Sequence, residues 1–84
     1  MKLTIIAEDK AVYKNRIAYI GIDLSEIPVN IHALQFDDSS NTGHIEFTDK
    51  SNENITSIPN WAEIAFNKYD DAVAALLEKK QDTP

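Results

Sequence analysis

The sequence contains no cysteine, and this absence excludes several kinds of chemistry. A disulfide framework, a thiolate zinc site and a cysteine nucleophile all need thiol groups. The fold must therefore be held together by packing alone. A chain without cysteine fits the cytosol, but a protein assembled there can later work elsewhere, so the composition leaves the compartment open.

Glycine and long apolar runs are also scarce. Gly21 and Gly43 are the only glycines, so no glycine-rich phosphate loop can form, and no serine lies in a G-x-S-x-G motif. The apolar run near the start stops at Glu8, which is too short for a signal peptide. No stretch approaches the roughly 18 apolar residues of a membrane span. We therefore expect a soluble protein that does not contact membranes.

Positive charge is the third shortage. Fourteen acidic residues face eight basic ones, for a net charge of −6, and Arg16 is the only arginine. Phosphate backbones should be repelled, so we expect no direct binding of nucleic acid. The acidic residues are scattered singly and in pairs, which favours ordinary solubility over mimicry of nucleic acid.

The chain has enough residues for one modest core, and we expect a single domain over residues 1–80 with a frayed tail at 81–84. Three short segments rich in β-branched residues begin at Lys2, Ala11 and Ile17 and are separated by polar turns, which predicts an N-terminal β-meander.

Two further strands are predicted around a polar turn in the middle of the chain. In "NIHALQF" the alternation places His32, Leu34 and Phe36 on one face, and in "HIEFT" it turns Ile45 and Phe47 inward. If these strands form a hairpin, its register decides whether the two histidines share a face, and the sequence does not specify that register. Residues 49–59 show no sustained periodicity and are expected to form an ordered loop.

A helix is predicted from Asn60, which stands three residues before Glu63 as in a capping box. Apolar residues then recur at spacings of three and four and form a stripe that can cover a sheet: Trp61, Ile64, Ala65, Tyr69, Ala72, Val73 and Leu76. The predicted fold class is α+β, a small antiparallel sheet of about 4–5 strands packed against one C-terminal helix.

Residues that could carry chemistry are few. His32 and His44 lack a ligand spacing such as H-E-x-x-H, so exposed or hydrogen-bonded sheet histidines are favoured over a metal site. The adjacent acids Asp37 and Asp38 diverge in direction on an extended chain, which disfavours paired-carboxylate catalysis. We predict no enzyme activity and no catalytic, cofactor-binding or metal-binding residues. Trp61 is either an exposed anchor for a partner or, as we favour, a contact between helix and sheet.

Three blocks of the sequence, "IHALQF", "GHIEF" and "NENITSIPNWA", resemble a group of small bacteriophage-encoded proteins often found beside tail-fibre or other virion genes. In that group the first block usually ends in tryptophan, where this chain has Phe36. The resemblance implies a phage setting and a role in the virion or in tail assembly, and it supplies no catalytic residues. The apolar residues of the three blocks suit a hydrophobic core. Gln35 and His44 are polar residues of these blocks and have no assigned role.

From these observations we expect a noncatalytic structural or interaction protein, a minor virion component or assembly helper that binds other phage structural proteins of the tail or tail fibre. Such a protein would be assembled in the host cytoplasm and located in the virion. Four apolar residues whose burial is hardest to explain are the candidate partner contacts: Ile20, Ile22, Leu24 and Ile27. The alternative is a small acidic inhibitor of a host defence enzyme. Homo-oligomerisation remains open because no heptad or other oligomer-specifying pattern is present.

Overall fold

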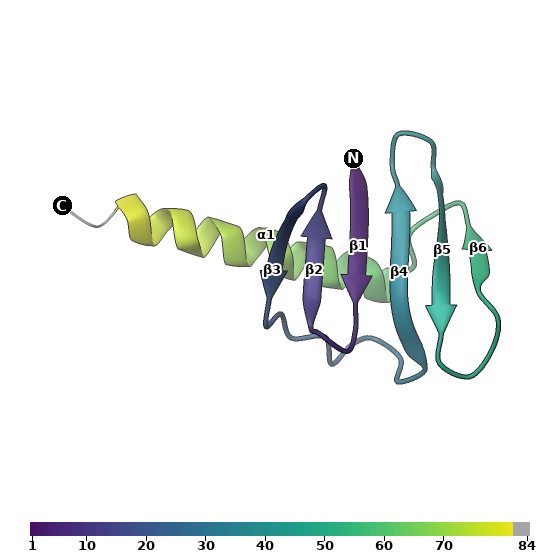
Figure 1. Ribbon diagram of the computed structural model, residues 1–84. Coiled ribbons are helices and arrows are strands. Elements are labelled where there is room, and N and C mark those ends of the chain that lie inside the picture. Colours follow the sequence, from purple (N-terminus) through teal and green to yellow (C-terminus); the bar gives the residue numbers. More distant parts are fainter. Residues whose placement is uncertain (82–84) are drawn as a thin grey trace.

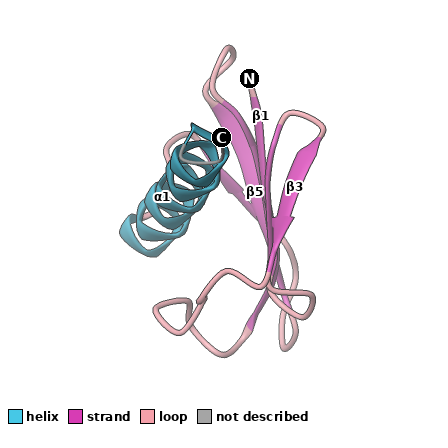
Figure 2. Cartoon of the chain, turned by 90° about the vertical axis from the view of Figure 1, so that its left-hand side faces the viewer, coloured by secondary structure: helices cyan, strands magenta, loops and turns pink. Residues whose placement is uncertain are grey.

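The protein is an open antiparallel sheet of six strands with one helix on one face, as the computed structural model shows (Figures 1 and 2). The structure describes residues 1–81, with side chains up to Leu76. The predicted α+β class is confirmed. The elements are β1 (Lys2–Ile6), β2 (Ala11–Lys14), β3 (Ile17–Ile20), β4 (Ile31–Asp37), β5 (Thr42–Phe47), β6 (Glu53–Ile55) and α1 (Asn60–Gln81).

The strand order is β3-β2-β1-β4-β5-β6, so the first strand of the chain lies near the centre of the sheet. β1, β2 and β3 form the predicted meander, with left-handed turn residues at Lys10 (φ 51°) and Asn15 (φ 57°). β6 lies within the segment expected to be a loop. It is only three residues long and is defined by its pairing with β5, because its sequence has no clear alternation.

The core lies between the sheet and α1. One cross-strand row, Val12–Ile5–Leu34–Ile45, runs through four strands, and its four members are all buried. The helix contributes Ala62, Ala65, Phe66 and Tyr69, which lie at spacings of three and four and therefore share one side of the helix. Burial of large aliphatic side chains such as Leu34 contributes roughly 1.5–3 kcal/mol each to folding.

A β-bulge in β4 changes the predicted side-chain pattern. The register with β5 shifts between Ile31 and Ala33, so His32 is the extra residue. His32 is exposed, whereas Ile31, Leu34 and Phe36 are in the core. The prediction that His32 shares a face with Leu34 and Phe36 is wrong, because strict alternation holds only where the ladder is regular.

The helix begins one residue earlier than a cap at Asn60 would require. The first helical hydrogen bond runs from the Glu63 N–H to the Pro59 carbonyl at 3.1 Å, so Pro59 is the N-cap and Asn60 is already helical. At the other end α1 includes Gln81, the first residue of the predicted tail, and residues 82–84 lie outside the described residues. Within residues 1–81, no helix is long and apolar enough to cross a membrane.

Candidate functional site

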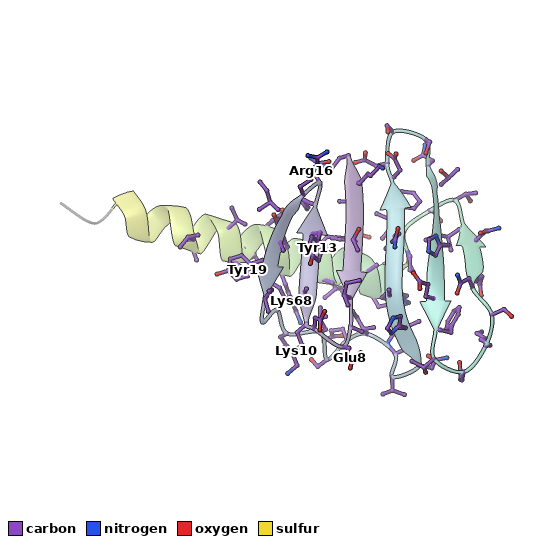
Figure 3. The ribbon with its side chains drawn as sticks, viewed as in Figure 1. Glu8, Lys10, Tyr13, Arg16, Tyr19 and Lys68 are labelled. Carbon is purple, nitrogen blue, oxygen red and sulfur yellow. The ribbon has the colours of Figure 1, made fainter. Side chains whose placement is uncertain are left out.

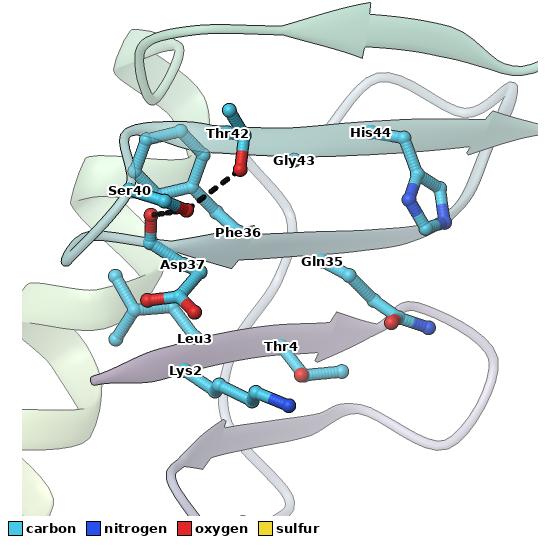
Figure 4. A pocket seen from close by; sticks show the side chains of 10 residues that line it. All are labelled: Lys2, Leu3, Thr4, Gln35, Phe36, Asp37, Ser40, Thr42, Gly43 and His44. Atoms are coloured by element: carbon cyan, nitrogen blue, oxygen red, sulfur yellow. Dashed lines mark hydrogen bonds between the residues drawn. The ribbon is translucent and has the colours of Figure 1, made fainter.

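A polar depression of about 290 Å³ lies over the start of β1, the end of β4 and the start of β5 (Figure 4). Its polar lining consists of Lys2, Thr4, Gln35, Asp37, Ser40, Thr42 and His44. Thr4, Gln35 and His44 stand in one cross-strand row on the sheet face that points away from α1. Gln35 and His44, which the sequence left without a role, are thus direct cross-strand partners.

The loop after β4 uses many of the hydrogen-bonding groups at this depression. The Asp37 carboxylate accepts bonds from the Ser39 hydroxyl and from the Ser39 N–H (3.0 Å). These bonds lower the pKa of Asp37 below its ordinary value. Burial opposes the shift, and the positive charges of the N-terminal ammonium group and Lys2 add to it. The Ser40 and Thr42 hydroxyls bond to each other at 2.7 Å.

The two histidines have different surroundings and do not form one site. His44 Nε2 lies 3.2 Å from Glu46 Oε2 on the same strand, and His32 projects from the bulge. Among residues 1–76, whose side chains the structure describes, no group of three or more histidine, aspartate or glutamate side chains is placed to hold a metal ion. The depression can hydrogen-bond a polar group through its amide, hydroxyl and carboxylate side chains.

A second candidate surface is the free edge of the sheet at β3, and here the backbone matters most. The Gly21 N–H donates to the Lys10 carbonyl at 3.0 Å, so Lys10 and Gly21 form a hydrogen-bonded pair. Such pairs alternate along an antiparallel ladder, so the next are Val12–Tyr19 and Lys14–Ile17. The N–H and C=O groups of the intervening residues, Ala18 and Ile20, therefore point away from β2 toward the open edge.

The side chains at this edge are apolar. Ile17 is 68% exposed and Ile20 is 70% exposed, and β3 carries neither a charged residue nor a proline. Natural sheets usually protect a free edge with charge, proline or a short strand. The opposite edge follows that rule, because β6 has three residues and includes Glu53.

The helix extends past the β3 edge (Figure 1). We call residues 70–81 of α1 the overhanging half. Ala72 and Val73 are partly buried against the core, whereas Ala74 and Ala75 are exposed and Leu76 is 47% exposed. Tyr69 connects the helix to the edge strand, since its hydroxyl donates to the Ile17 carbonyl at 3.1 Å and its ring meets the Tyr19 ring edge-on.

Cationic residues border the same edge. Figure 3 shows Arg16 at one end of β3 and Lys10 at the other. Lys14 and Lys68 also lie nearby, and they form ion pairs with Asp70 and Asp23, respectively. Lys10 shares its turn with Glu8 and Asp9, so Arg16 is the cation with the fewest acidic neighbours in sequence.

The four predicted partner-contact residues have different positions in the structure. Ile22 and Ile27 are buried in the core, which explains the apolar character that made them candidates and leaves little of their side chains for a partner. Leu24 is partly buried against the core, and Ile20 is exposed at the β3 edge. Binding through Ile20 stays a prediction. Ile17 was missed because an exposed edge strand and an inner strand have the same apolar composition.

Trp61 lies where the favoured interpretation placed it. Its side chain is partly buried against the core and lines a hollow together with Ile45, Phe47, Ile55 and Pro59. It therefore joins the start of α1 to β5 and β6.

Comparisons of this chain with family models, with curated proteins and with solved structures gave no match.

Proposed function

We propose that this protein is a noncatalytic interaction protein of a bacteriophage, a minor virion component or assembly helper that binds the tail or tail fibre. The observation that carries the proposal is that an unprotected apolar strand edge lies beside a part of the helix in which Ala74, Ala75 and Leu76 are exposed. A strand edge offers main-chain hydrogen bonds to another chain, and exposed apolar side chains beside it favour a protein partner.

The sequence resemblance supports the phage setting, and the fold shows what the resembling blocks do. "IHALQF" forms most of β4, "GHIEF" lies in β5, and "NENITSIPNWA" covers β6 and the start of α1. These elements are adjacent in the sheet and contain much of the core. The resemblance therefore rests on residues that specify the fold, whereas the β3 edge lies outside the three blocks and suits a partner particular to this protein.

Purified particles give the direct test. Mass spectrometry of phage particles purified by density gradient should detect this chain together with tail proteins, and a tagged copy expressed during infection should capture a tail or fibre protein. A capsid-only fraction is the control for nonspecific adsorption. Persistent absence from particles, together with no captured structural protein, would contradict the proposal.

The acidic composition supports a second candidate, an inhibitor that blocks a basic groove of a host defence enzyme. Binding of that kind depends on exposed charge and should weaken strongly as ionic strength rises. Binding through main-chain bonds and apolar contacts should persist. Repeating the capture experiment in molar salt therefore separates the two functions, because loss of the partner favours the inhibitor and retention argues against it.

A further inference from the structure

We propose that the β3 edge takes up an extended segment of a partner protein as an added strand, beneath the overhanging half of α1. The inference rests on the proposed function for the existence of a partner, and it names the chemistry of that partner. The segment is a strand with apolar residues at every second position and an acidic residue near one end.

The backbone supplies the first part of the case. The N–H and C=O groups of Ala18 and Ile20 point outward, as the ladder between β2 and β3 requires. Their spacing of two residues is the repeat with which a neighbouring antiparallel strand presents its own groups. An added strand can therefore form several main-chain bonds without any change in the existing sheet.

The length of α1 supplies the second part. A helix of 22 residues is about 33 Å long at about 1.5 Å per residue. Tyr69 lies against β3, because its hydroxyl donates to the Ile17 carbonyl and its ring meets the Tyr19 ring. The overhanging half, residues 70–81, therefore continues about 18 Å beyond Tyr69, and neighbouring strands are about 4.8 Å apart, so there is room for at least two added strands.

The side chains define which residues the segment needs. Ile17 and Tyr19 of β3 point to the helix-facing side of the sheet, as do their partners on β2, Lys14 and Val12. Val73 and Leu76 lie on the overhanging half. Alternate apolar residues of an added strand would enter the space between these two surfaces, and the residues between them would face solvent on the open side of the sheet.

Charge defines the ends of the segment. Arg16 is exposed at the start of β3, and Lys10 is exposed beside its end (Figure 3). A segment with an acidic residue beside Arg16 would gain a favourable contact, whereas a basic residue there would be repelled. The effect is modest because the site is exposed.

A second copy of this chain fits the edge less well. Antiparallel pairing of two β3 strands needs a two-fold axis normal to the sheet, which brings both helices to the same face. Each helix continues about 18 Å beyond its own Tyr69, so the two overhanging halves would compete for the same space. A partner segment that lacks such a helix avoids this conflict.

The test uses a capped peptide, acetyl-Glu-Thr-Val-Thr-Val-Thr-Val-Glu-amide, titrated into the full chain and followed by amide NMR and hydrogen exchange. We expect the Ile20 amide to shift and to gain protection. Ala18→Pro should weaken binding at least about tenfold, because it removes an outward donor and leaves a carbonyl of the peptide unpaired. Proline is tolerated at such a position of an edge strand, so the fold should persist.

Matched controls make the result specific. Ala18→Thr keeps the N–H and should bind within about threefold of the unchanged chain, since the main-chain bonds are retained. Replacing both peptide glutamates by lysines, or making Arg16→Gln, should weaken binding by about twofold to fivefold at low salt. Circular dichroism of each variant checks the fold.

Several outcomes would overturn the inference. These are no protection of Ile20 at millimolar peptide, equal binding by Ala18→Pro, protection at β6 instead, or a dimer in light scattering with Ile20 protected before peptide is added. The proposed phage function and the proposed binding edge can be rejected independently of each other. Peptide binding by a chain that is absent from virions would reject the phage role alone, and capture of a tail protein by Ala18→Pro would reject the edge alone.

Discussion

The two halves of α1 have very different surroundings, although both are regular helix. In the first half, Ala62, Ala65, Phe66 and Tyr69 are buried against the sheet. In the overhanging half, Ala74 and Ala75 are exposed, and Leu76 is nearly half exposed. The first half is therefore stabilised by burial, and the second depends mainly on the helix propensity of alanine and leucine. Because a short helix without packing is marginal in water, the overhanging half has stability to gain from a partner.

The largest expected effect comes from removing a large side chain from each half. Phe66→Ala should lower the free energy of unfolding by about 4 kcal/mol, because it leaves a cavity in the core, and Leu76→Ala should lower it by less than about 1 kcal/mol. Urea denaturation followed by Trp61 fluorescence measures both changes. Phe66→Leu gives a milder variant if Phe66→Ala does not fold. Similar losses for the Phe66 and Leu76 variants would show that the two halves are equally packed.

The two glycines extend the comparison to the sheet. An alanine at position 43, in the paired centre, would place its Cβ 2.2 Å from the Gln35 carbonyl oxygen and 2.7 Å from the Phe36 Cα. We expect Gly43→Ala to cost about 3 kcal/mol, because two strand backbones must move apart. Gly21, which follows β3, has a φ of 88° and open space around it, so Gly21→Ala should cost about 1 kcal/mol from backbone strain alone.

Thermal unfolding monitored by circular dichroism would rank the two glycine variants. A larger loss for Gly21→Ala than for Gly43→Ala would contradict the view that the β3 side of the molecule is the less constrained one.

Tyr69 stands at the junction between the two halves. Tyr69→Phe removes the bond to the Ile17 carbonyl and keeps the ring, so it should cost about 1 kcal/mol. Hydrogen exchange should show faster exchange in residues 70–76 and little change in residues 62–66, because the bond fastens the helix where it leaves the sheet. Uniform acceleration along α1 would instead mean that the helix unfolds as one unit.

The smallest effect concerns charge in the loop beside the polar depression. Ser39→Ala removes the hydroxyl bond that contributes most to the lowered pKa of Asp37, so that pKa should rise toward its ordinary value of 3.8. A carboxyl group whose pKa is lowered by folding stabilises the fold at any pH above its ordinary pKa, and this contribution is lost as the pH falls through the lowered pKa. The variant should thus be slightly less stable at neutral pH and equal to the unchanged chain at strongly acidic pH.

An NMR titration of the Asp37 carboxyl carbon, combined with urea denaturation at pH 7 and at pH 2, would test this prediction. The Ser40→Ala variant is the matched control, because Ser40 bonds to Thr42 and to a main-chain carbonyl and leaves the Asp37 carboxylate untouched. An unchanged Asp37 pKa in Ser39→Ala would contradict the assigned cause.

The sequence predicts the elements whose apolar residues recur with a regular period. It does not predict features that depend on which strands pair with each other. The apolar stripe of α1 and the alternation of β5 are local patterns, so the helix, the meander and the fold class follow from them. The bulge at His32 and the short strand β6 exist because of a neighbouring strand, and nothing in their own residues requires them. The position of β3 at the edge of the sheet could not be predicted for the same reason. "IAYI" has the composition of a buried strand, and only the strand order shows that it lies outermost.

The place of β1 in the middle of the sheet constrains how the chain can fold during synthesis. Its hairpin with β2 can form early, but its other neighbour, β4, is made about 30 residues later, and the covering helix comes last. A nascent chain that stops before Tyr69 therefore has all six strands but leaves the apolar face of the sheet largely uncovered. The sheet therefore remains prone to aggregation until α1 has been synthesised and can cover it.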